Sequence, residues 1–258
     1  MKGDQRLRQL SAAFAVAVVS TLIVSCGGGN QSGPASSSAS SSATTTSSKP
    51  PVAQAALANL LLTPAEIDSL LGVTGSKSKD KIDKLSSDPP PTSGAWKFPD
   101  ECLYILGPVG TPVYAGSGNT AVSGDDDVTS LNNDQDIDLA QALVLFPSAK
   151  EANDFFTTSS QRWPACADRQ FTMPASSDLP ELSWKTGPFS NANANANGTL
   201  SVTVTNTVNF NSPPTIITFQ RALTVHNNVA IDIALMRKDP ADFAVKVAGQ
   251  IADKVDKQ

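Results

Sequence analysis

The sequence predicts an α+β domain: a mainly antiparallel β-sheet flanked by helices, built as a single domain. Three strand-like runs, at residues 199–208, 215–225 and 229–236, follow one another closely near the C-terminus. Consecutive strands with short connections pair antiparallel, and the helical patterns lie before and after this group. The globular part, residues 55–258, is long enough for one domain with a sizeable core.

The strand pattern is clearest at residues 199–208, where aliphatic side chains alternate with Ser and Thr. Such alternation predicts a strand with one buried face. Residues 226–228, His-Asn-Asn, separate the next two runs, and because Asn tolerates positive φ they predict a tight hairpin. The continuous apolar run at 142–146 predicts a strand buried on both faces.

Three segments carry helix signals. The first begins at Thr63, followed by Pro and by Glu at the capping-box position, and ends at Gly72. The second begins at Ser148, carries an apolar stripe at helical spacing and ends at Pro164. The third begins at Asp239. These helices are expected to cover the sheet.

The remaining segments have weaker patterns. Residues 76–88 are polar and Lys-rich, and residues 125–138 are acidic, so both are expected to be exposed loops. Short strands are expected near residues 103–106 and 113–122, where apolar side chains cluster between Gly and Pro.

The N-terminus has the pattern of an export signal. Residues 1–25 combine basic side chains with an apolar run that is too short to span a bilayer. Residues 23–26, Ile-Val-Ser-Cys, resemble a lipobox, which implies cleavage before Cys26 and acyl chains such as palmitate on its sulfur. The alternatives are an uncleaved anchor or a plain signal. We expect a chain anchored in the membrane by lipid, on its outer face.

Residues 26–54 are rich in Ser, Thr, Pro and Gly and cannot bury a core, so they predict a disordered tether. The full chain has a net charge of −5, and residues 1–25 carry +2, so the chain without them carries about −7. That charge argues against a nucleic-acid partner, because phosphate binding requires clustered Lys and Arg. The membrane partner is expected to be reached through the acyl chains on Cys26.

Two cysteines remain after Cys26. In an exported protein an isolated pair predicts a disulfide, here between Cys102 and Cys166. A free or catalytic thiol is the alternative. The bridge would close a loop of about 65 residues, which the chain-entropy estimate values at roughly 4 kcal/mol.

The motifs of catalysis and metal binding are incomplete. His226 is the only histidine, which excludes a zinc site built on several histidines within this chain. Ser76–Lys79 matches S-x-x-K and residues 185–187 match K-T-G, but the serine lies in an expected loop and not at the start of a buried helix. Residues 134–138 begin like a calcium loop without its Gly and Glu. We therefore predict no catalytic residue, metal site or cofactor, with loose calcium binding as an alternative for the acidic loop.

The segment 114–122 is the candidate ligand site. Its small residues let a ligand approach the backbone closely, and Tyr114, Ser117 and Asn119 would supply polar contacts. The alternative is tight sheet packing followed by a turn.

Several short motifs occur together in a fixed order. They are Leu-Leu-Leu-Thr-Pro-Ala-Glu-Ile at 60–67, Asp-Glu-Cys at 100–102, Tyr-Ala-Gly-Ser-Gly at 114–118, Leu-Phe-Pro-Ser-Ala at 145–149, Trp-Pro-Ala-Cys-Ala at 163–167, and Arg-Ala-Leu-Thr-Val at 221–225 before Asn-Asn-Val. Over roughly residues 60–256 the chain resembles the mycobacterial PknH-like extracellular sensor-domain family, found on receptor serine/threonine kinases and alone on lipoproteins. The resemblance implies a central cleft for an unidentified ligand and structural disulfides, and no catalytic residues. Many members have a second cysteine pair, absent here, and Trp where this chain has Asn119.

These observations lead to one expected function and two alternatives. The expected function is a non-enzymatic, lipid-anchored binding module whose cleft takes a small or lipidic envelope molecule or a peptide. One alternative is a protein-interaction scaffold for envelope enzymes or receptor kinases. The other is a hydrolase, which the incomplete motifs disfavour.

Overall fold

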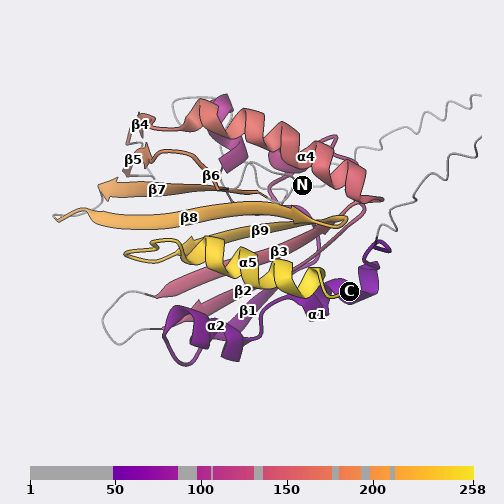
Figure 1. Ribbon diagram of the computed structural model, residues 1–258. Coiled ribbons are helices and arrows are strands. Elements are labelled where there is room, and N and C mark those ends of the chain that lie inside the picture. Colours follow the sequence, from indigo (N-terminus) through magenta and orange to yellow (C-terminus); the bar gives the residue numbers. More distant parts are fainter. Residues whose placement is uncertain are drawn as a thin grey trace, which may run out of the picture. The chain divides into compact units, whose positions relative to one another are not determined.

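The computed structural model describes residues 49–86, 98–105, 107–130, 136–175, 180–192, 198–209 and 213–258. These residues belong to one compact unit, 47–258. Within them an antiparallel nine-stranded sheet is covered by helices (Figure 1), so the predicted α+β class is confirmed. The predicted signal peptide, Cys26 and most of the predicted tether lie outside the described residues.

The sheet contains every strand of the described chain. The strands are β1 Lys77–Ile82, β2 Ala121–Thr129, β3 Ile137–Leu145, β4 Gln170–Met173, β5 Glu181–Thr186, β6 Ser190–Ala192, β7 Thr199–Asn209, β8 Thr215–His226 and β9 Val229–Met236. Their order across the sheet is β1-β2-β3-β9-β8-β7-β5-β4, with β6 beside β7. The three strands predicted near the C-terminus are therefore β7, β8 and β9, paired as expected.

The helices are short except for two. They are α1 Leu57–Leu60, α2 Pro64–Leu71, α3 Thr111–Tyr114, α4 Ala149–Arg162 and α5 Phe243–Val255, with 3-10 turns η1 Gln54–Ala56, η2 Asp100–Ile105 and η3 Trp163–Cys166. Within the described residues, no helix combines the length and the apolarity that a membrane crossing requires.

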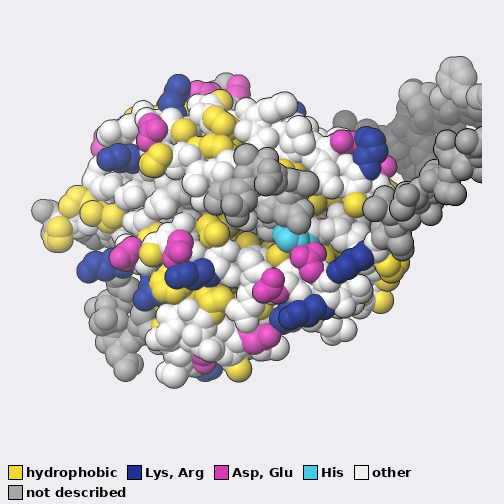
Figure 2. All heavy atoms as spheres, viewed as in Figure 1, with side chains coloured by type: hydrophobic (Ala, Val, Ile, Leu, Met, Phe, Trp, Pro, Cys, Tyr) yellow, Lys and Arg dark blue, Asp and Glu magenta, His cyan; other side chains and the backbone are white. Residues whose placement is uncertain are grey.

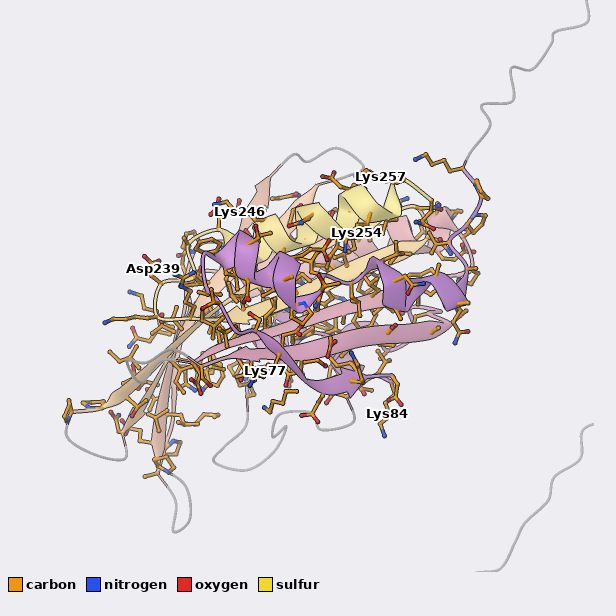
Figure 3. The ribbon with its side chains drawn as sticks, turned by 90° about the horizontal axis from the view of Figure 1, so that it is seen from below. Lys77, Lys84, Asp239, Lys246, Lys254 and Lys257 are labelled. Atoms are coloured by element: carbon orange, nitrogen blue, oxygen red, sulfur yellow. A yellow bond between two sulfur atoms is a disulfide. The ribbon has the colours of Figure 1, made fainter. Side chains whose placement is uncertain are left out.

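Two hydrophobic cores lie on the two faces of the sheet. On one face α5 packs with α1 and α2, and on the other face α4 packs with η2 and α3 (Figure 1). Strands β3, β8 and β9 contribute alternate side chains to both cores. This explains why the run at 142–146 is apolar throughout. Lys254 on α5 ties its helix to the α1–α2 connection, because its Nζ donates to the Leu61 carbonyl and to Glu66, each at 2.9 Å (Figure 3).

The local signals for the first two helices and the hairpin are confirmed, whereas the third helix, expected from Asp239, begins at Phe243. At the start of α2 the Thr63 amide donates to Glu66 Oε2 at 2.7 Å, the Glu66 amide donates to Thr63 Oγ1 at 3.4 Å, and Gly72 ends the helix at φ 67°. Ser148 caps α4 by accepting the Lys150 amide at 3.1 Å. Asn227 adopts φ 52° in the β8–β9 hairpin.

The predicted loop at 76–88 is wrong over its first half, which forms β1. Nearly all side chains of β1 are exposed, so the strand shows no apolar alternation. It is an edge strand held to β2 by charge pairs: Lys81 with Asp125, and Lys79 with Asp126 at 3.7 Å. Lysines are typical of exposed edges, where they oppose pairing with another chain.

Three other predictions are corrected. Asp125–Asp127 lie within β2 and Asp138 within β3, so the acidic segment is a loop only between these strands, where residues 131–135 are outside the described part. The short strand expected at 103–106 is the end of η2. The strand expected at 113–122 is the end of α3, which has Pro near its start, followed by a turn and the first residues of β2.

The chain enters the domain at the β8–β9 hairpin. Asn228 is buried, and its side chain accepts the Val52 amide at 2.7 Å and donates to the Val52 and Phe146 carbonyls at 3.2 and 2.9 Å. Residues 50–54, assigned by the sequence to the tether, therefore pack on the domain.

Candidate functional site

A groove of about 340 Å³ lies on the α4 face of the sheet. It is lined by Gly107, Asp126, Asp138, Ala140, Trp184, Phe219, Ala234 and Met236. Because Phe219 pairs with Met236 at the opposite ends of β8 and β9 from their hairpin, the groove is far from the point where the chain enters the domain.

Small side chains form the floor of the groove. Ala140 of β3 and Ala234 of β9 are direct neighbours in the sheet, and both are only partly buried. Phe219 and Met236, the next pair along the floor, are also partly open, and Met236 is 38% exposed. The pair of alanines leaves room above the sheet that larger residues would fill.

Aromatic rings close one end of the groove. Trp184 reaches across from β5 to Phe219, with ring centroids 6.3 Å apart. Its indole also meets Phe98 edge-on at 5.2 Å and stacks on Phe171 at 6.2 Å. Rings packed in this way hold one another in position and present a large apolar surface.

Two carboxyl groups lie at the other end. Asp126 is opposite Ala140 and Asp138 is opposite Val128, which makes the two aspartates diagonal neighbours on one face. Burial raises the pKa of Asp126 above its usual value, and the nearby Asp138 raises it further, whereas Lys79 lowers it. The groove is therefore apolar along its length and acidic at one end.

A buried polar cluster fixes the segment that forms one side of the groove. Asp232 Oδ2 accepts the Val109 amide and the Tyr114 hydroxyl, each at 3.0 Å, and Asp232 Oδ1 accepts from Arg221 Nη2 at 2.5 Å. Val109 has φ 52°, a conformation that favours Gly. Burial raises the pKa of Asp232 although Arg221 lowers it, and burial together with Asp232 raises the pKa of Tyr114. Asp232 thus anchors the segment that includes Gly107.

Of the three predicted ligand contacts, Ser117 and Asn119 have side chains in contact, whereas the Tyr114 side chain lies apart in the core. Tyr114 is 1% exposed, its ring stacks on Phe155, and its hydroxyl is bonded to Asp232, so it is a core residue and not a surface contact. Ser117 Oγ donates to Asn119 Oδ1 at 3.2 Å. Ser117 lines a second, more polar depression of about 320 Å³ beside α4, where Glu151, Asp154 and Arg162 also lie.

The catalytic motifs are separated by the fold. Ser76, just before the edge strand β1, shares a hydrogen bond between its hydroxyl and that of Thr129 at 2.6 Å. Thr186 lies on β5, near the opposite edge of the sheet, and its hydroxyl donates to the Cys166 carbonyl. His226 lies at the surface (Figure 2), with Nδ1 at 2.9 Å from Asp256. In the described part of the chain, no cluster of three or more His, Cys, Asp or Glu could hold a metal ion. Part of the calcium-like motif lies outside that part.

Cys102 and Cys166 form a disulfide, with their Cα atoms 5.0 Å apart. Both are completely buried, and the bridge joins η2 to η3. Because Gly107 follows η2, the disulfide helps to hold the same side of the groove that Asp232 anchors.

The residues that line the groove were not recognised in the sequence. Trp184 and Phe219 belong to different strands separated by β7, so no local spacing connects them. Asp126 and Asp138 fall in the segment interpreted as a loop. Alternation along β8 predicts that Phe219, Arg221 and Leu223 lie on one face of the sheet. Which residues of other strands lie beside them depends on the strand order, which the sequence does not show.

Comparison with a solved structure defines the class of protein. The crystal structure of the extracellular domain of PknH from Mycobacterium tuberculosis matches with a TM-score of 0.67 and 28% identity, over 81% of this chain and 99% of that chain. The fold is thus that of the extracellular domain of a serine/threonine-protein kinase.

The family follows from the sequence. The model of the PknH-like extracellular domain matches residues 52–254, and the chain belongs to this family. Serine/threonine-protein kinase PknH of Mycobacterium bovis and of Mycobacterium tuberculosis is 29% identical over 220 residues, which are 80% of this chain. The match spans only 32% and 30% of those kinases, about a third of their length.

Proposed function

We propose that this chain is a lipid-anchored binding module of the cell envelope, which holds a small molecule with an apolar body in the groove above Ala140 and Ala234. One observation carries the proposal: the groove is already formed in the fold and has a mainly apolar lining. A concave, mostly apolar pocket with a few polar groups is the usual form of a small-molecule site. Its volume of about 340 Å³ suits a small ligand.

Binding fits the arrangement better than catalysis does. The charged groups that line the groove are two carboxyls. The motif residues Ser76 and Thr186 lie toward opposite edges of the sheet, and their hydroxyls are hydrogen-bonded to other groups. A nucleophile requires an activating base within hydrogen-bond reach. The proposed function therefore requires that the groove bind its ligand more tightly than other molecules, and it requires no bond breaking.

The position of the groove suits an anchored protein. The chain enters the domain at the β8–β9 hairpin through Val52 and Asn228, whereas the groove lies at the other end of these strands. Val229 and Met236 are seven positions apart along β9, a distance of about 23 Å at the usual rise of a strand. The point where the chain joins the domain is therefore remote from the groove.

Filling the groove tests the proposal. In Ala140→Leu the larger side chain occupies the space above the floor, so the chain purified from its own membranes should lose the molecule that native mass spectrometry finds with the wild type. Ala149→Leu, at an exposed position of α4 outside the groove, is the matched control and should retain it. Retention of the molecule by a folded Ala140→Leu variant would contradict the proposal.

A second function, protein interaction, is favoured by a different observation. The ends of β7 and β8 extend beyond the neighbouring strands (Figure 1), and Ile216 there is 63% exposed. An isolated apolar side chain at a projecting edge suits contact with another protein. Ile216→Lys should then reduce crosslinking of the full chain to an envelope protein, and should leave the molecule bound in the groove unchanged.

A further inference from the structure

The two ends of the groove differ in chemistry. Trp184 and Phe219 form an aromatic end, while Asp126 and Asp138 form an acidic end. The acidic end begins at β2, and Phe219 is on β8, three strands away in the order β2-β3-β9-β8. At a usual strand spacing this is about 14 Å. A molecule that spans the groove must therefore be apolar at one end and compatible with carboxylates at the other.

The charges around the groove favour one sign of ligand. Among the described residues that line it, the charged ones are both aspartates. Lys79 approaches Asp126 at 3.7 Å from the exposed edge, where its side chain is 52% exposed, and Asp80 adds another carboxyl nearby. Besides burial, Asp138 raises the pKa of Asp126 through its charge and through a hydrogen bond between the two side chains, so the pair favours a shared proton over two adjacent negative charges. A cation placed beside the pair favours the ionised form of both carboxyls.

The acidic end also lacks the donors that an anion or a sugar would require. Asp138 Oδ1 is shielded from solvent and has no hydrogen-bond partner within the described chain. Carboxylates accept hydrogen bonds and donate none when ionised. A carboxylate or phosphate ligand would face repulsion at this position, and a neutral ligand would gain nothing from the carboxylate charge that the exposed Lys79 only partly offsets.

We propose that the groove binds an organic cation: a molecule whose ammonium or amidinium group lies between Asp126 and Asp138 and whose apolar body extends over the Ala140–Ala234 floor to Trp184. This inference rests on the proposed function and adds the class of ligand to it. Aromatic faces tolerate cations as well as apolar groups, so the orientation is set by the two aspartates.

Three probes that share one apolar body test the inference: phenylbutylamine, phenylbutanol and phenylbutanoate. They differ in the head group alone, which is cationic, neutral or anionic at neutral pH. Titration calorimetry with the full chain in lipid nanodiscs, with empty nanodiscs as the blank, should show the amine binding about tenfold tighter than the alcohol, and the carboxylate binding weakest.

Variants connect the preference to the aspartates. The double variant Asp126→Asn, Asp138→Asn keeps the shape of the side chains and should lower the affinity for the amine about tenfold, to that of the alcohol, with no change for the alcohol. Asp253→Asn, at an exposed position of α5 on the other face of the sheet, should change none of the three affinities. Circular dichroism of each variant verifies that the fold is retained.

The outcomes separate the two levels of the proposal. If the alcohol and the carboxylate bind the wild type as tightly as the amine does, or if the double variant keeps the preference, the groove remains a site but the inference about cations is overturned. If Ala140→Leu does not weaken any of the probes, the groove itself is not the site, and the proposed function fails with the inference.

Discussion

Asp232 lies at the centre of a buried polar cluster on the α4 face of the sheet. It is completely buried, pairs with Arg221, and accepts from Tyr114 and Val109. Removing one partner of a buried ion pair leaves an uncompensated charge and typically costs about 3–5 kcal/mol. The Tyr114 hydroxyl, in contrast, adds one hydrogen bond to a charged group, so the cluster offers a graded test of what each contact contributes.

Tyr114→Phe should lower the free energy of unfolding by about 1.5–3 kcal/mol, because it removes a buried hydrogen bond to a charged acceptor. The measurement is urea denaturation followed by fluorescence. Tyr104→Phe is the matched control, since Tyr104 is half-buried and contacts Arg162 through its ring, and it should change stability little. Equal effects of the two substitutions would show that the Asp232 hydrogen bond contributes nothing measurable.

Asp127 gives stability a dependence on pH. It is 1% exposed, and burial raises its pKa to about 6 from the usual 3.8, although the hydrogen bond from Gln141 at 2.8 Å lowers it. Between these pH values the folded chain holds a proton that the unfolded chain has released. Stability therefore falls as pH rises through this window, by roughly 3 kcal/mol at most.

Asp127→Asn should remove that loss, because an amide oxygen still accepts from Gln141 and carries no charge. We expect the variant to be more stable than the wild type by about 2–3 kcal/mol at pH 8 and nearly equal to it at pH 4. Urea denaturation at a series of pH values measures this difference. Lys81, Asp125 and Asp126 also act on this carboxyl, and a variant with the same pH profile as the wild type would assign the dependence to them.

At the scale of the elements, the disulfide holds η2, which leads to Gly107 at one side of the groove. Cys102–Cys166 closes a loop with a sequence separation of 64 residues, for which the chain-entropy estimate is about 4 kcal/mol. The double variant Cys102→Ser, Cys166→Ser should lose stability of that order, measured by denaturation. It should also weaken phenylbutylamine binding, because η2 leads to Gly107 at the groove.

Reduction of the wild type provides the control for that variant. A reductant strong enough to open the buried bridge should produce the same two losses in the wild type and no change in the double variant. If the folded double variant bound the amine with unchanged affinity, the disulfide would stabilise the domain without positioning the groove.

The elements that the sequence predicted correctly are those with local causes. The capping box from Thr63 to Glu66 and the positive φ of Asn227 depend on residues within three positions of one another. The errors occurred where distant partners decide the structure. β1 is a strand because its backbone pairs with that of β2, more than 40 residues away. The apolar run at 142–146 was recognised because burial on both faces leaves a signal that requires no knowledge of the partners.

The candidate site was harder to predict for the same reason. Tyr114 was chosen for the small residues around it, yet its hydroxyl bonds to Asp232, 118 positions away. The groove exists because β3 and β9 place Ala140 beside Ala234, and because Trp184 reaches over β7. Such a site depends on strand order and register, which the alternation of single strands does not specify.

At the scale of the whole molecule, anchoring and binding are expected to be independent. The chain enters the domain near Val52 and the β8–β9 hairpin, at the other end of the strands from the groove. Strands β8 and β9 and helix α5 run between the two ends, but no described residue that holds the entering chain, such as Asn228, lines the groove. A change at one end should therefore leave the other unaffected, which gives a prediction with two opposite variants.

Cys26→Ala should abolish acylation of the chain and its lipid-dependent retention in the membrane, as seen by mass spectrometry and fractionation, because the proposed anchor consists of acyl chains on that sulfur. Its affinity for phenylbutylamine should stay within about twofold of the wild type. Ala140→Leu should show the reverse, with normal acylation and retention but no binding. The two variants therefore change different measurements. A loss of binding in Cys26→Ala would show that the membrane anchor contributes to the site. Unchanged membrane retention of Cys26→Ala would show that Cys26 is not the anchor.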